Sequence, residues 1–143
     1  MSEYIAPYIS RNEYECPCCH RIPYILEKHG IVTPYNLLFE SFELIRSKWG
    51  KPIKISSGYT CPKFNRAIGG AELSAHLFGL ALDLDLDNVQ EVRQLDQLIE
   101  RWTPQLRRGT YEETGTFIHI DVAYFIYPIV LEEWHEGARW TDY

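Results

Sequence analysis

"SAHLFGLALDLDLD", residues 74–87, alternates leucine with small or acidic residues. In an extended strand, successive side chains point to opposite faces. The leucines at positions 80, 82, 84 and 86 would therefore share one face, which we expect to pack against the core. Ala81, Asp83, Asp85 and Asp87 would share the other face. Because a carboxylate beside a core is costly unless it is paired, hydrated or metal-bound, the pattern raises the question of which cation, if any, lies over Asp83.

Length and composition bound the remaining possibilities. The chain has 143 residues, of which 45% are apolar, and this predicts one globular domain over residues 1–143. The net charge of −6 argues against a nucleic-acid partner, and Arg101, Arg107 and Arg108 form the one candidate basic cluster. No apolar run is long enough to insert into a membrane, and the first 20 residues do not resemble a signal peptide. We therefore expect synthesis in the cytoplasm, and a monomer.

The periodicity predicts helices around a small sheet. Helices are expected over 33–50, with Thr33 as cap and Gly50 at the end, and over 61–70. A third follows Asn88, which with Glu91 forms a capping box, and ends at Trp102. Strands are expected over 51–59, 80–86 and 115–124. The fold class is therefore α+β, with a small, mostly antiparallel sheet flanked by helices.

Four residues have the types and spacing of a metal site. His76 and Asp83 lie seven positions apart around Gly79, which permits a sharp bend. His119 and Asp121 share one face of the 115–124 strand, so pairing of the two strands would bring them to Asp83. Such a set suits a catalytic zinc, which takes three protein ligands and keeps a fourth position for water. Alternatively, His76 caps a turn and the acids are solvated residues that protect a sheet edge.

The same segments resemble the zinc D-alanyl-D-alanine carboxypeptidase family of peptidoglycan peptidases, in its compact phage-type branch. The resemblance covers "ISSGYTCPKFNRAIGGAELSAHLFGLALDL" (55–84) and "FIHIDV" (117–122). The matching positions are Ser57, Gly58, Tyr59, Asn65, Gly69, Gly70, Ser74, His76, Gly79, Ala81, Asp83, Phe117, His119 and Asp121. The resemblance implies that His76, Asp83 and His119 bind one catalytic Zn²⁺ on the sheet.

Two positions depart from the family pattern. Thr60 stands where the family has an arginine that pairs with the substrate carboxylate, and a hydroxyl cannot supply that charge; Arg66 or Lys63 would have to compensate. Thr116 stands where many relatives carry the general base. Asp121 is then the candidate base, with Glu112 and Glu113 on the preceding loop in reserve.

Four residues have expected roles near the metal. Tyr59 and Ser74 are candidate substrate contacts, as is Arg66, although Ser74 is equally suited to capping a turn. Asp85 is a candidate hydrogen-bond partner for a histidine ligand.

The cysteines allow three interpretations. Cys16 and Cys19 in "ECPCCHR" (15–21) have the spacing of half a structural zinc site, which Cys61 with Cys18 or His20 would complete. A disulfide to Cys61 and free thiols packed in the core are the alternatives.

The resemblance implies a zinc peptidase that cuts stem peptides or cross-bridges of peptidoglycan, as a carboxypeptidase or an endolysin-type endopeptidase. It would act on the bacterial cell wall after release from the cell. Two other classes stay open: a zinc-holding module that binds peptidoglycan without turnover, and a structural virion component.

Overall fold

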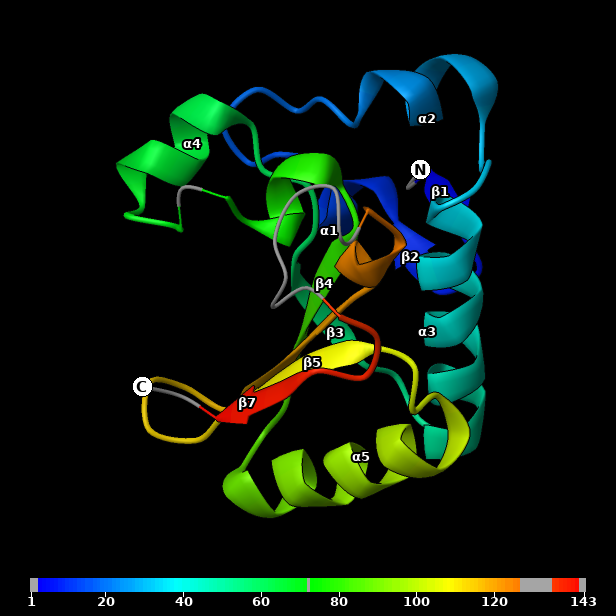
Figure 1. The fold of residues 1–143 in the computed structure, drawn as a ribbon, viewed down its shortest axis with the longest axis vertical. Coiled ribbons are helices and arrows are strands. Elements are labelled where there is room, and N and C mark those ends of the chain that lie inside the picture. The colour runs from blue at the N-terminus through cyan, green and yellow to red at the C-terminus, as the bar shows by residue number, and fades with distance from the viewer. Residues whose placement is uncertain (1–2, 72, 127–134, 142–143) are drawn as a thin grey trace.

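A sheet of five strands, in the order β3-β4-β6-β5-β7, forms the centre of the molecule (Figure 1). The computed structural model describes residues 3–71, 73–126 and 135–141. The strands are β3 (Lys54–Ser57), β4 (Ala81–Asp85), β5 (Arg107–Tyr111), β6 (Phe117–Asp121) and β7 (Arg139–Thr141). Neighbours pair antiparallel except β5 and β7, which run parallel. The α+β class with a mostly antiparallel sheet is confirmed.

Helices lie around this sheet, and α3 and α5 pack against each other (Figure 1). The helical elements are α1 (Arg11–Tyr14), α2 (Tyr24–His29), α3 (Tyr35–Trp49), α4 (Pro62–Ala67), η1 (Ala75–Phe78), α5 (Val89–Trp102) and η2 (Ala123–Ile126). Two short strands, β1 (Tyr4–Ala6) and β2 (Ile9–Ser10), form a separate antiparallel pair. None of the helices in the described ranges is long and apolar enough to span a bilayer.

The leucine face of β4 lies in the core, as predicted. The leucines at positions 80, 82, 84 and 86 are all buried, and Leu82 and Leu84 are register partners of Ile120 and Ile118 on β6. These side chains join one apolar cluster with residues of α3 and α5. The opposite face of β4 therefore keeps Ala81, Asp83 and Asp85.

Local signals explain where the helices begin and end, with two corrections. Gly50 ends α3 in the left-handed conformation, at φ 80°, where an L side chain would be strained. Asn88 caps α5 by accepting from the amide of Glu91, while Glu91 accepts from the amide of Asp87 instead of closing the predicted box on Asn88. The predicted cap at Thr33 is wrong, because Pro34 occupies the N-cap of α3 and no side chain caps it.

The other predicted helices and strands are present in the structure but are shorter than the predicted ranges. The strands predicted over 51–59 and 115–124 are β3 and β6, and the helix predicted over 61–70 is α4, capped by the sulfur of Cys61. Sequence patterns did not predict β5 and β7, which contain arginine, glycine and threonine in place of an apolar alternation.

Candidate metal and active site

His76, Asp83 and His119 meet at one point on the polar face of the sheet. Nε2 of His76 lies 3.2 Å from Oδ1 of Asp83, and Nδ1 of His119 lies 2.9 Å from the same oxygen. One potential ligand atom of each residue lies within 4.8 Å of the other two. The three residues singled out in the sequence are therefore close enough to share one metal ion.

The backbone positions each of the three side chains. Asp83 and His119 are direct register partners in the β4–β6 ladder, so they emerge side by side on the same face. His76 lies on η1, whose first turn is capped by Ser74, the acceptor for the amide of His76. Gly79 then reverses the chain at φ 71° and leads into β4, which brings His76 back over Asp83.

The far nitrogen of each histidine has its own hydrogen-bond acceptor. Nδ1 of His76 donates to the backbone carbonyl of Gly58 at 2.6 Å, because a carbonyl can only accept. Nε2 of His119 lies 2.6 Å from a carboxylate oxygen of Asp121. Such outer acceptors orient the ring and leave the other nitrogen available to a metal, an arrangement typical of zinc-bound histidine. Two imidazoles and one carboxylate are also the donor types that catalytic zinc accepts.

The electrostatics of the cluster are those of a cation site. Burial alone would lower the pKa of His119, but hydrogen bonds to the carboxylates of Asp121 and Asp83 outweigh it and raise the pKa to about 9. Burial would raise the pKa of Asp83, yet His76 and His119 hold it well below its usual range. The two carboxylates thus stabilise positive charge between them, and a metal bound through His119 must displace a proton.

Asp121 is fully buried and has several partners. Its carboxylate forms a two-point ion pair with Arg107, at 2.8 and 3.1 Å. It also accepts from the amide of Ala123 at 3.0 Å and from His119. Burial raises its pKa, but His119 and Arg107 outweigh that effect and lower it. A carboxylate held in this way is better suited to orienting His119 than to collecting a proton from water.

Glu112 and Glu113, the alternative candidates for the general base, lie in different surroundings. Both oxygens of Glu112 accept from the guanidinium of Arg93 on α5, at 3.0 and 3.2 Å. Because α5 packs on the apolar side of the sheet, this ion pair directs Glu112 away from His119. Glu113 is exposed on the loop between β5 and β6. Thr116 uses its hydroxyl to bind the carbonyl of Leu86, at 2.7 Å.

The predicted substrate contacts are divided between structural and exposed positions. Ser74 caps η1, so its alternative role as a cap is present. Tyr59 packs against the core, and its amide binds the carbonyl of Tyr14. Arg66 is exposed on α4. The carboxylate of Asp85 lies 4.0 Å from the ammonium of Lys54 on the edge strand β3 and is 43% exposed, so it pairs across the sheet edge.

An aromatic cluster lies beside His119, and of its members the sequence patterns singled out Phe117 but not Trp140. Trp140 lies 5.4 Å from the His119 ring, centre to centre, and donates its indole N–H to Tyr111 at 2.8 Å. Tyr111 stacks on Phe117 at 4.3 Å. Gly109 makes this possible, because a Cβ there would lie 2.1 Å from the Trp140 indole. The sequence signal for an aromatic neighbour of His119 was Phe117, which shares its strand face. Trp140 reaches His119 from strand β7, which the sequence patterns did not predict. Trp134 lies outside the described residues.

Comparison with known proteins identifies a family. A family model described as Peptidase M15 matches residues 19–121, which include all three residues of the His76, Asp83 and His119 cluster. No curated protein matches the chain.

Proposed function

The chain belongs to the peptidase M15 family of zinc metallopeptidases, and from that membership we propose that it hydrolyses peptide bonds in peptidoglycan stem peptides or cross-bridges. The family match establishes the zinc-dependent class of the enzyme. The substrate, the ligand assignment and the roles of individual residues are our proposal.

One observation carries the ligand assignment. The ligand-side atoms of His76, Asp83 and His119 converge, and both histidines have an acceptor on the nitrogen that faces away. A cluster that only protected a sheet edge would not need acceptors at Gly58 and Asp121. We therefore assign these three residues as the zinc ligands.

The residues around the ligands have separable tasks. Zinc bound there would polarise the scissile carbonyl and lower the pKa of a bound water toward about 7. Asp121 orients His119, and Arg107 holds Asp121 in place. We propose that the half-buried aromatic cluster formed by Tyr111, Phe117 and Trp140 supports the peptide beside His119.

The proton acceptor is assigned to the loop between β5 and β6. Asp121 is buried and held by Arg107, and Glu112 pairs with Arg93 on α5; we propose Glu113 because its side chain is exposed on the same loop. We expect Glu113→Gln to retain zinc while hydrolysis falls by roughly 10²–10⁴-fold, the usual contribution of a positioned base. Glu112→Gln is the matched control and should keep near wild-type activity; the reverse outcome would reassign the base to Glu112.

The residue at position 60 favours internal bonds over terminal ones. Thr60 is 2% exposed and uncharged, so it offers no cation to a terminal carboxylate. Arg66 and Lys63 are exposed on α4 instead. We therefore propose that cleavage within stem peptides or cross-bridges is faster than release of a terminal D-alanine.

Digestion of purified sacculi, with mass spectrometry of the released fragments, tests the function. Zinc-loaded wild type should release new peptide termini, and His119→Ala should release none. Internal fragments should exceed free D-alanine. If zinc-loaded wild type cuts neither sacculi nor stem peptides but still sediments with sacculi, the protein is a binding module and the hydrolase proposal is wrong.

A further inference from the structure

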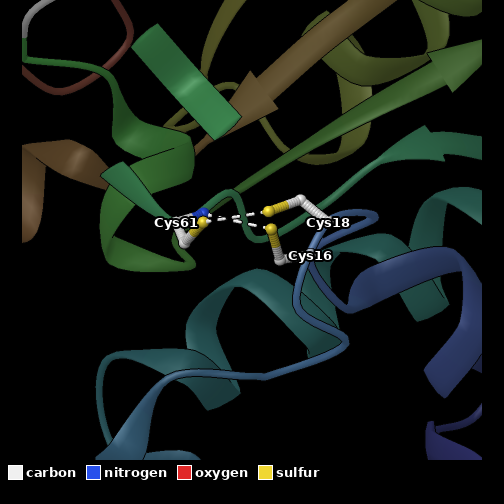
Figure 2. Close-up of side chains that lie close together, drawn as sticks. All are labelled: Cys16, Cys18 and Cys61. Atoms are coloured by element: carbon white, nitrogen blue, oxygen red, sulfur yellow. Dashed lines mark hydrogen bonds between the residues drawn. The ribbon is translucent and has the colours of Figure 1, made fainter. Parts of the chain in front are cut away.

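The four cysteines of the chain gather in one place, remote in sequence from the histidine cluster. Figure 2 shows Cys16 and Cys18, on the loop after α1, pointing toward Cys61 at the start of α4. The sulfur atoms of these three residues all lie within 4.8 Å of one another. The thiol of Cys19 also interacts with the side chains of Cys16 and Cys61. The chain contains no further cysteine.

The separation of the Cys18 and Cys61 sulfurs matches a metal site and not a disulfide. The sulfurs of Cys18 and Cys61 are 3.9 Å apart, whereas a disulfide bond is about 2.05 Å long. Four sulfurs at about 2.3 Å from a tetrahedral zinc lie about 3.8 Å from one another. All four cysteines are free thiols in the structure.

Backbone amides converge on the sulfur atoms. The amide of Cys61 donates to the sulfur of Cys16 at 3.3 Å, and the amides of Cys18 and Cys19 donate to the same atom. The amide of Phe64 donates to the sulfur of Cys61 at 3.4 Å. Hydrogen bonds of this kind favour negative charge on sulfur, and a thiolate at the buried position of Cys16 would require a cation.

The backbone of the loop over residues 16–21, which carries Cys16, Cys18 and Cys19, turns back on itself. His20 adopts the left-handed conformation at φ 59°, and the amide of Cys16 donates to the carbonyl of Arg21. The ring of His20 binds Glu15 instead of the cysteines. Because the thiol of Cys19 contacts Cys16 and Cys61, whereas the contact given for the His20 ring is with Glu15, we take Cys19 as the fourth ligand.

We propose that Cys16, Cys18, Cys19 and Cys61 bind a second, structural zinc ion. With four protein ligands the site is closed, as in structural zinc sites, and has no position for substrate. The metal would tie the N-terminal loop to the segment 58–61, which lies directly behind His76. There Gly58 accepts from the ring of His76, and the amide of Thr60 donates to the carbonyl of His76. The site stands independently of the proposed peptidase activity.

Metal analysis of a variant without the sheet site tests the proposal. His76→Ala/His119→Ala, purified under reducing conditions, should contain one zinc per chain. X-ray absorption at the zinc edge should show sulfur neighbours only, at about 2.3 Å. This measurement leaves the cysteines intact, so it does not depend on the folding of a cysteine variant. A zinc-free protein with four thiols that react freely with Ellman's reagent, or with a disulfide by intact mass, would overturn the proposal.

Cysteine variants in the same background complete the test. Cys18→Ser changes an exposed residue and should lose the remaining zinc, as should Cys61→Ser. Lys63→Ser, two positions after Cys61 on the exposed side of α4, is the control and should keep it. Retention of the full zinc content by both cysteine variants would place the metal elsewhere.

Discussion

The two clusters of candidate metal ligands differ in how the chain holds them. The histidine cluster is built on paired strands, where the register sets Asp83 beside His119 and the apolar core lies on the opposite face. The cysteine cluster is built on a loop and a helix start, where backbone amides hold the sulfurs. The ligands of the histidine cluster come together only when strands β4 and β6 pair. The cysteine cluster instead connects the N-terminal loop to the start of α4, two segments that are not paired in the sheet.

This difference suggests that the histidine cluster serves catalysis and the cysteine cluster serves folding stability. Side chains on a ladder are held at fixed spacing, which suits a site that must keep a geometry through a reaction. Loop ligands gain more from the metal, because the metal itself supplies the order. Tyr14 links the two regions: its hydroxyl donates to the carbonyl of Gly79 at 2.7 Å, and its carbonyl accepts from Tyr59 at 2.7 Å.

The largest expected effect follows from removing a ligand on the sheet. His119→Ala should reduce hydrolysis by about 10³-fold or more, since metal activation of water and carbonyl accounts for several kcal/mol of the barrier. Zinc analysis should show the loss of one ion and retention of the cysteine-bound one. Loss of both ions together would show that the two regions are one cooperative unit.

A smaller effect is expected from the residue behind that ligand. Asp121→Asn should lower zinc affinity and activity together, by about 10–100-fold, as for other residues that orient metal-bound histidines. Competition with a chelator measures the affinity, and Asp85→Asn, on the same face but at the exposed edge, is the control. Unchanged zinc affinity with a slower reaction would instead restore Asp121 as the general base.

Packing against the sheet site is tested at Gly109. In Gly109→Ala the new methyl group would meet the Trp140 indole, so Trp140 must move from its place beside His119. Overpacking of this kind costs about 1–3 kcal/mol of unfolding free energy, which denaturant unfolding followed by Trp fluorescence would measure. An unchanged midpoint would mean that strand β7 adapts without loss.

The smallest effect is expected at the link between the regions. Tyr14→Phe removes one buried hydrogen bond to the Gly79 carbonyl, and should cost about 1 kcal/mol. Thermal unfolding of the zinc-loaded protein would measure it, with Tyr24→Phe, an exposed tyrosine on α2, as the control. Equal effects in the two variants would show that the link contributes nothing beyond a surface tyrosine.

Much of the sheet site was readable from local pattern. The alternation in 80–87 predicted which side of β4 is buried, and the spacing of His119 and Asp121 predicted their common face, because side-chain direction in a strand depends only on position. The resemblance supplied the ligand set, and the spacing of Cys16 and Cys19 indicated a possible second metal.

Only the tertiary structure decided which partners these residues meet. The role of Asp121 follows from Arg107, its register partner on β5, and the setting of Glu112 follows from Arg93 on α5. Trp140 reaches His119 through the parallel pairing of β7 with β5, and Cys18 joins Cys16 and Cys61 through a turn at His20. Periodicity sets the face on which a side chain emerges, but contacts between distant segments depend on register and packing, which no local pattern encodes.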